Sequence, residues 1–192
     1  MPPPEIWGPA IWTLFHTLSE KMNEKMYNVI APQLFNHIVR ICSFLPCPEC
    51  AQDATKFLAK IKINDLKNKV QFKNTFYLFH NYVNTKKRKP LFNYANINKY
   101  KNYNIINVFK NFINVYNTKG NMKLLTESFQ RQFVIKDFTN WFKSCIRVFI
   151  PYVNIHTPPK LIVNEVKEET IISSSLEKPI EEEENIVLNI SD

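Results

Sequence analysis

Residues 44–53 read FLPCPECAQD, and this stretch contains the boundary between two predicted helices. The apolar residues within 34–45 recur at intervals of three and four, which is the spacing of one helix face. Pro46 interrupts that pattern, because proline lacks the backbone N–H that a helix interior requires. The helical spacing resumes at Pro48, so we expect Cys47 to lie at, or just before, the amino terminus of the next helix.

Helical spacing also dominates the sequence on both sides of this stretch. Gly8 and Pro9 suit the start of a first helix and Pro32 the start of a second, since proline is favoured at the first helical position. Strand signals are weak in this region. We therefore expect an all-α fold with helices over residues 7–30, 32–45, 48–61, 72–83, 105–117 and 125–149.

The charge of the chain is unevenly distributed. The net charge is +8, but residues 160–192 hold nine acidic residues and three lysines, which leaves +14 on the residues before them. We predict a disordered acidic tail over residues 159–192, because a segment rich in Ser and Glu cannot bury enough apolar surface to offset the entropy lost on ordering. The basic body is compatible with nucleic-acid binding, but its Lys and Asn content is also typical of an AT-rich genome, so charge alone does not indicate that function.

The amino-terminal sequence, MPPPEIWGPAIW, lacks the charged and apolar segments of a secretory signal. No run of eighteen apolar residues occurs, so we expect no membrane-spanning helix. These features predict a soluble protein made in a reducing compartment. In such a compartment, a CxxC pair is more often a redox centre or part of a metal site than a structural disulfide.

Two kinds of chemistry suit the pair formed by Cys47 and Cys50. A cysteine at a helix amino terminus has a lowered pKa, because unpaired N–H groups and the helix dipole stabilise its thiolate, and this favours redox chemistry. A zinc site would need two more ligands, and no second close pair such as CxxC or HxxxH occurs. A thioredoxin-like site would need alternating strands and helices, which the flanking sequence does not predict.

Three motifs occur in order between about residues 7 and 92, namely GPAIWTLFHT, FLPCPECAQD and HNYVNTKKRKPLF. Together they resemble the Erv/ALR family of FAD-linked sulfhydryl oxidases, of the type carried by large nucleocytoplasmic DNA viruses. The chain departs from the family pattern at Pro9, where an Arg is expected, and it has neither a second CxxC nor an additional carboxyl-terminal disulfide. The residues that carry the resemblance are Trp12, His16, Pro46, Cys47, Cys50, Ala51, His80, Asn81, Val83, Asn84, Lys89 and Pro90.

The resemblance implies a fold and a division of the chain. The fold is a four-helix bundle with a short fifth helix, which holds FAD non-covalently beside the CxxC. On this basis residues 1–92 are the FAD-binding sulfhydryl oxidase module, residues 93–158 are a helical carboxyl-terminal extension, and residues 159–192 are the acidic tail. The independent helix prediction agrees with the all-α fold of the module.

The resemblance also implies a reaction. A substrate dithiol reduces the Cys47–Cys50 disulfide, and the electrons pass to FAD and then to O2, which gives H2O2. Cys47 is expected to meet the substrate and Cys50 to face the flavin. Lys87 and Arg88 are expected to be solvated charges. The expected cofactor-binding residues are Gly8, Trp12, His16, Cys50, His80, Asn81, Val83, Asn84, Lys86 and Lys89, and no metal is expected.

Several alternatives remain open at this stage. Trp12, His16 and His80 could instead be ordinary core residues. Cys42 and Cys145 are either buried free thiols or a relay for electrons. A different class of function is a helical binding module, in which the CxxC is half of a metal site and the basic body contacts nucleic acid.

The expected partners follow from the oxidase interpretation. They are proteins that carry dithiols, with O2 as electron acceptor and no requirement for nucleic acid. A homodimer is expected. The expected location is the host cytoplasm or the virion, where the enzyme would form disulfide bonds in virion proteins.

Overall fold

A computed structural model describes residues 3–117 and 125–150 of the chain. These residues form helices and connecting segments, with no strand among them, so the predicted all-α fold is confirmed. Within the same ranges we find no helix that is both long and apolar enough to cross a bilayer. The α-helices are α1 (Pro4–Lys21), α2 (Tyr27–Ser43), α3 (Pro48–Leu58), α4 (Lys69–Lys86), α5 (Ile105–Tyr116) and α6 (Leu125–Cys145), and the 3-10 helices are η1 (Glu24–Met26), η2 (Ile63–Asp65), η3 (Tyr94–Asn102) and η5 (Ile146–Val148).

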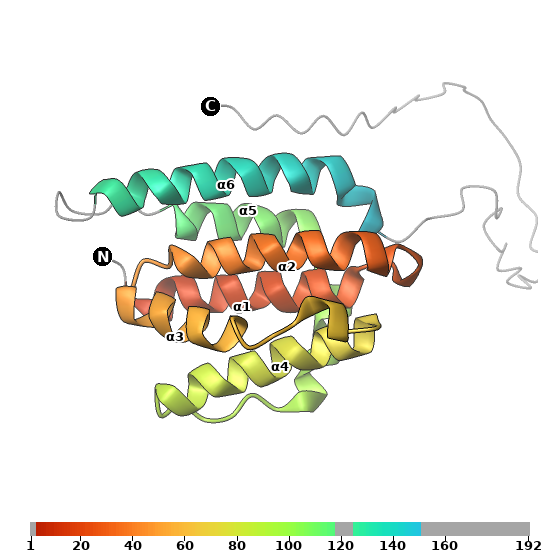
Figure 1. Cartoon of the computed structure of the whole chain (residues 1–192), viewed down its shortest axis with the longest axis horizontal. Coiled ribbons are helices and arrows are strands. Elements are labelled where there is room, and N and C mark those ends of the chain that lie inside the picture. The colour runs from red at the N-terminus through yellow and green to blue at the C-terminus, as the bar shows by residue number, and fades with distance from the viewer. Residues whose placement is uncertain (1–2, 118–124, 151–192) are drawn as a thin grey trace, which may run out of the picture. The chain divides into compact units, whose positions relative to one another are not determined.

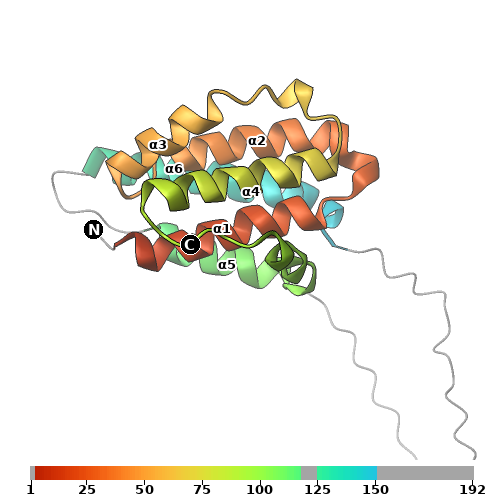
Figure 2. The same cartoon turned by 90° about the horizontal axis from the view of Figure 1, so that it is seen from below.

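The α-helices lie side by side along the long axis of the molecule (Figure 1). The first helix, α1, packs against α4, α5 and η3, while α2 packs against α3 and α6. The view turned by 90° shows α3, α2 and α4 on one side of α1 and α5 on the other (Figure 2). This arrangement leaves α3, with the CxxC at its start, next to both α2 and α4.

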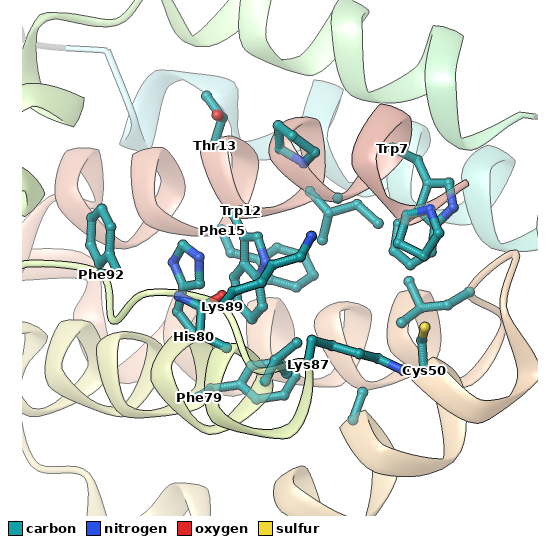
Figure 3. A pocket seen from close by; sticks show the side chains of 18 of the residues that line it. Trp7, Trp12, Thr13, Phe15, Cys50, Phe79, His80, Lys87, Lys89 and Phe92 are labelled. Carbon is teal, nitrogen blue, oxygen red and sulfur yellow. The ribbon is translucent and has the colours of Figure 1, made fainter. Parts of the chain in front are cut away.

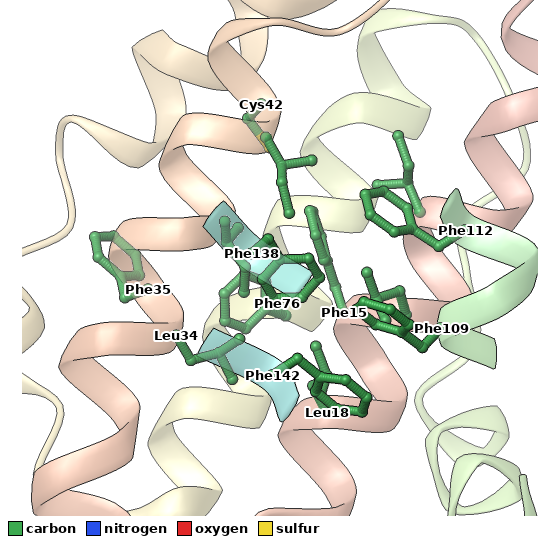
Figure 4. Packing of buried hydrophobic residues seen from close by; sticks show 14 of the residues in the cluster. Phe15, Leu18, Leu34, Phe35, Cys42, Phe76, Phe109, Phe112, Phe138 and Phe142 are labelled. Atoms are coloured by element: carbon green, nitrogen blue, oxygen red, sulfur yellow. The ribbon is translucent and has the colours of Figure 1, made fainter. Parts of the chain in front are cut away.

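One hydrophobic core joins α1, α2 and α4 to α5 and α6 (Figure 4). Because α5 and α6 share this core, the described residues belong to one compact unit. The division between residues 1–92 and 93–158 therefore stays a prediction from the resemblance, and the predicted tail at 159–192 lies outside the described residues. The buried aromatic residues of this core include Phe15, Phe76, Phe109, Phe112, Phe138 and Phe142.

The boundaries of the first two helices differ from the sequence prediction. The first helix ends at Lys21 rather than near residue 30, because Met22 has an extended ψ of 128° and the Asn23 side chain caps the following turn. The predictions that Gly8 and Pro9 start the first helix and that Pro32 starts the second are wrong. The first helix, α1, begins at Pro4 and contains Pro9, and α2 begins at Tyr27 and contains Pro32. A proline inside a helix costs one backbone hydrogen bond, and burial of the apolar face of α2 on both sides of Pro32 offsets that cost.

The other predicted helices are confirmed, with ends that differ by a few residues. Side-chain caps set several of their starts. Asn68 accepts a hydrogen bond from the Gln71 backbone N–H at the start of α4, and Asn104 caps α5 in the same way. Capping side chains of this kind satisfy N–H groups that have no partner within the helix.

We expect Phe138→Ala to lower the free energy of unfolding by about 3–5 kcal/mol, because it removes a large side chain from a closely packed core. Phe138 is fully buried (0% exposed), and its ring lies 5.5 Å from that of Phe109. Phe133→Ala on the same helix is the matched control, since Phe133 is 65% exposed and its loss should change the stability by about 0.5 kcal/mol or less. Urea unfolding with an unchanged m-value measures both. Equal, small effects would mean that α6 does not belong to the core.

Candidate functional site

The CxxC lies at the amino terminus of α3, as the sequence predicts. Cys47 is the residue that caps this helix, and its Sγ accepts a hydrogen bond from the Cys50 backbone N–H at 3.2 Å. Pro48 occupies the first helical position, where its missing N–H costs nothing. The two half-buried cysteines form a disulfide with their Cα atoms 5.2 Å apart. A disulfide at this place can be opened by an attacking thiolate, and the helix amino terminus then stabilises the thiolate that is released.

Cys50 lines a cavity of about 490 Å³ between α1, α3 and α4, with η3 completing the wall (Figure 3). This volume lies within the range of roughly 300–1,000 Å³ that small-molecule and cofactor sites occupy. Most of the wall is apolar. Its aromatic members are Trp7, Trp12, Phe15, Phe79, Phe92 and Tyr100.

A stack of flat rings forms one side of the cavity. The His80 ring lies parallel to that of Trp12, with centroids 4.1 Å apart and an angle of 8° between the planes. It also stacks on Phe92 at 4.7 Å. Behind it, the His16 ring stacks on both Phe92 and Tyr100. A rigid aromatic wall of this kind suits a flat heteroaromatic ligand.

His16 and His80 are joined by a hydrogen bond between His16 Nε2 and His80 Nδ1, at 3.0 Å. Burial, reinforced by the nearby His80 and by the Lys99 charge, lowers the pKa of His16 to about 3. Burial and Lys99 likewise lower the pKa of His80 to about 4. Both rings are therefore neutral at pH 7, with one donating to the other, and the pair adds no charge to the cavity.

Three lysines line the cavity and provide positive charge, namely Lys87, Lys89 and Lys99. Lys89 Nζ lies 3.0 Å from Glu5 Oε1, and Lys87 Nζ lies 3.3 Å from Glu49 Oε1. Lys99 lies over the Tyr100 ring, 5.2 Å from its centroid. Figure 3 shows the Lys87 side chain extending towards Cys50. An apolar cavity with lysines along it can hold a ligand that combines flat rings with an anionic group such as a pyrophosphate.

The structure brings most of the residues proposed from the sequence to this one cavity. Three of them lie elsewhere. His16 lies behind His80, Asn81 exchanges two hydrogen bonds with the backbone of Phe92 at 2.7 and 3.1 Å, and Lys86 lies over the Tyr82 ring. The proposed residues that line the cavity are Gly8, Trp12, Cys50, His80, Val83, Asn84 and Lys89.

Sequence reasoning missed several residues of the wall. Lys87, expected to be a solvated charge, lines the cavity. Lys99 and Tyr100 come from η3, a 3-10 helix that packs against α1. Phe92 is the last residue of the third motif, HNYVNTKKRKPLF. Its place in that motif is the one sequence signal that could have identified it as part of the wall. The bonds from Asn81 place Phe92 at the wall.

The other two cysteines are protonated thiols. Cys42 is 1% exposed and lines the cavity wall, and burial strongly raises its pKa. Cys145 lies on α6, where its Sγ–H donates to the Trp141 carbonyl, and burial raises its pKa to about 11. Within residues 3–117 and 125–150 we find no group of three or more His, Cys, Asp or Glu residues placed to hold a metal ion.

Residues 9–104, half of the chain, match the Erv1/Alr family. The chain belongs to this family. The match includes Cys47, Cys50 and the whole aromatic wall except Trp7, and it stops just before α5.

Two viral proteins resemble the Erv1/Alr segment of the chain. The 347L protein of Invertebrate iridescent virus 6, which is named as an FAD-linked sulfhydryl oxidase, is 29% identical over 94 residues, which are 46% of this chain and 85% of that protein. The 096R protein of Invertebrate iridescent virus 3, named for the same activity, is 28% identical over 88 residues, or 45% of this chain and 60% of that protein. No solved structure matches the chain.

The neutral histidine pair predicts how stability depends on pH. We expect the free energy of unfolding to fall as the pH is lowered from about 6.5 towards about 4. In that window unfolded His16 and His80 take up protons, but the folded residues, with a pKa of about 3 and about 4, do not. The stabilisation that comes from the two neutral histidines is therefore fully present above about 6.5, the pKa of an unfolded histidine. Urea unfolding at a series of pH values measures it.

His16→Gln is the control for this pH dependence, because carboxyl groups also titrate in acid. The variant removes one of the two titrating rings, so its stability should fall less steeply over the same pH window than that of the unmodified chain. Identical slopes would contradict the low pKa assigned to His16.

Proposed function

We propose that the protein is an FAD-linked thiol oxidase whose redox centre is the Cys47–Cys50 disulfide. The observation that carries this proposal is the position of Cys50. This half of the Cys47–Cys50 disulfide lines a cavity whose wall contains aromatic residues and lysines. Membership of the Erv1/Alr family and the names of the two viral relatives support the same activity.

The residues around the cavity fit FAD by their chemistry. The stacked rings of Trp12, His80 and Phe92 offer flat apolar contacts to an isoalloxazine or adenine ring. The cavity lysines provide cations for the pyrophosphate. At Gly8, an added Cβ would meet no atom within 4 Å, so this part of the wall leaves room for a ligand. When bound there, FAD would accept an electron pair from the cysteines and pass it to O2.

The chain itself performs the exchange of disulfides. A substrate thiolate attacks Cys47 Sγ, which breaks the Cys47–Cys50 bond, forms a mixed disulfide and releases Cys50 as a thiolate. The second substrate thiolate then attacks the substrate sulfur of the mixed disulfide. The substrate leaves with a new disulfide, Cys47 is released, and the enzyme pair has gained two electrons. The overall reaction is 2 R–SH + O2 → R–S–S–R + H2O2.

The positions of the two sulfurs suit different tasks. Cys50 lines the cavity, whereas Cys47 is not among the residues that line it. Cys47 caps α3, where the positive end of the helix favours its thiolate form. We therefore assign the substrate-facing role to Cys47 and the cofactor-facing role to Cys50.

The biological role follows from the same proposal. Proteins with paired thiols are the substrates, and the relatives in iridescent viruses favour a role in forming disulfides of virion proteins, in the host cytoplasm or in the virion. Homodimer formation stays a prediction from the family resemblance.

The visible absorption spectrum of the purified protein tests this function. The protein should be yellow, and anaerobic dithiothreitol should bleach its flavin band, because electrons then enter through the cysteines and cannot leave to oxygen. A folded protein that stays colourless when supplied with FAD would contradict the proposal and favour the helical binding module, for which bound zinc would be the next measurement.

Cysteine variants test the assigned roles. We expect Cys47→Ser and Cys50→Ser each to abolish oxygen uptake with dithiothreitol, while FAD stays bound by the aromatic wall and the lysines. Cys145→Ser is the matched control and should retain full activity, since its thiol is protonated and bonded to Trp141. Turnover in either CxxC variant would contradict the mechanism, and loss of activity in Cys145→Ser would show that Cys145 relays electrons.

A further inference from the structure

Tyr116, the last residue of α5, reaches the backbone that leads into the CxxC. Its ring is fully buried and stacks on Phe112, with centroids 5.0 Å apart. Its hydroxyl donates to the Ile41 carbonyl at 2.8 Å and also lies 3.2 Å from the Phe44 carbonyl. Burial raises the pKa of Tyr116, so the hydroxyl remains a donor at neutral pH.

The two carbonyls need such a donor because of the prolines around Cys47. In a continuous helix, the Phe44 carbonyl would accept from the backbone N–H of residue 48, which is a proline without that hydrogen. The Ile41 carbonyl belongs to the last turn of α2, where carbonyls lack partners within the helix. Within this turn, the Ile41 carbonyl accepts one backbone hydrogen bond, from the Phe44 N–H at 3.3 Å. The Tyr116 hydroxyl therefore supplies a bond that the chain around the CxxC does not.

This contact joins the backbone before the CxxC to a part of the chain outside the family match, which ends at residue 104. Phe44 is three residues before Cys47, and Leu45 between them lines the same cavity as Cys50. Cys47 then receives the hydrogen bond from Cys50 N–H at the start of α3. The backbone from the end of α2 to the first sulfur is thus held at its start by Tyr116 and at its end by the helix cap.

We propose that Tyr116 is a positioning residue that holds the backbone before Cys47 in place and thereby favours the Cys47–Cys50 disulfide over the dithiol. As a role in catalysis this rests on the proposed oxidase function, but the effect on the disulfide itself does not. Tyr116 acts through the Ile41 and Phe44 carbonyls and touches neither sulfur in any contact that the structure shows.

The expected direction of the shift in the thiol–disulfide equilibrium follows from the contacts that hold Cys47 in each redox form. In the oxidised form, the S–S bond keeps Cys47 close to Cys50 with or without the Tyr116 hydroxyl. In the reduced form only non-covalent contacts do so, and their loss gives the dithiol more conformational freedom. Removing the hydroxyl should therefore shift the equilibrium towards the dithiol, which takes up two electrons and two protons from the redox buffer.

The test is the thiol–disulfide equilibrium of Tyr116→Phe, measured on the full chain. The protein is equilibrated without oxygen in dithiothreitol buffers of graded oxidised-to-reduced ratio, alkylated, and the peptide that carries Cys47 and Cys50 is analysed by mass. We expect about a threefold to tenfold shift towards the dithiol, the range of one neutral hydrogen bond, or about 15–30 mV in reduction potential.

Tyr27→Phe is the matched control. The Tyr27 hydroxyl donates to the Leu66 carbonyl at 2.7 Å, and Tyr27 lies at the opposite end of α2 from the CxxC. This variant loses a comparable hydrogen bond and should lose comparable stability, but its redox equilibrium should not move. No shift in Tyr116→Phe, or an equal shift in Tyr27→Phe, would overturn the proposal.

A second measurement needs no variant. Amide hydrogen exchange at Phe44 should stay slow after the unmodified protein is reduced, because the Tyr116 bonds do not involve sulfur. Fast exchange there on reduction would overturn the proposal. Neither measurement requires flavin or oxygen, so a colourless protein would contradict the oxidase function alone, and a yellow, active protein with no shift in Tyr116→Phe would contradict only this inference.

Discussion

The break in the backbone between α2 and α3 is the constraint on which the rest of the site depends. Pro46 and Pro48 prevent a continuous helix, so α2 ends at Ser43 and a new helix begins one residue after Cys47. The break gives Cys47 the capping position and places Cys50 in the first turn of α3. From there Cys50 reaches a cavity whose other walls come from helices distant in sequence. A straight helix through residues 44–50 would provide neither the free N–H groups nor the bend.

The cavity combines a stack of uncharged aromatic rings with three lysines, of which Lys99 lies over the Phe92 and Tyr100 rings. Burial keeps His16 and His80 neutral, so they act as stacked rings joined by a hydrogen bond and not as cations. The lysines are partly balanced by carboxylates, with Glu5 beside Lys89 and Glu49 beside Lys87. Glu49 lies within the CxxC itself, so this ion pair links the end of α4 to the start of α3. The wall of one cavity therefore offers both the apolar and the cationic contacts that a flavin dinucleotide requires.

The segment after residue 104 is part of the architecture of the site although it lies outside the family match. α5 packs on α1 and α6 packs on α2, so each covers a helix that leads to the cavity. Tyr116 provides a direct contact between α5 and this turn, since its hydroxyl lies within hydrogen-bonding distance of the Ile41 and Phe44 carbonyls at the end of α2. Removal of α5 and α6 would expose the apolar faces of α1 and α2 as well as those carbonyls.

The helical class, most helix positions and the place of Cys47 at a helix start could all be predicted from the sequence alone. These depend on local periodicity, on proline and on helix capping, which act over a few residues. The motif resemblance also indicated Trp12, His80 and Lys89, which the structure brings to one cavity. Proline was a poor guide to the start of α2, because burial of an apolar face outweighed one missing hydrogen bond.

Three features of the site depend on tertiary packing. It brings Lys87, Lys99 and Tyr100 into the wall and places His16 behind His80. It also brings the Tyr116 hydroxyl to carbonyls that are 72 and 75 residues away along the chain. Such contacts depend on how helices pack, and packing joins residues whose separation in sequence carries no periodic signal.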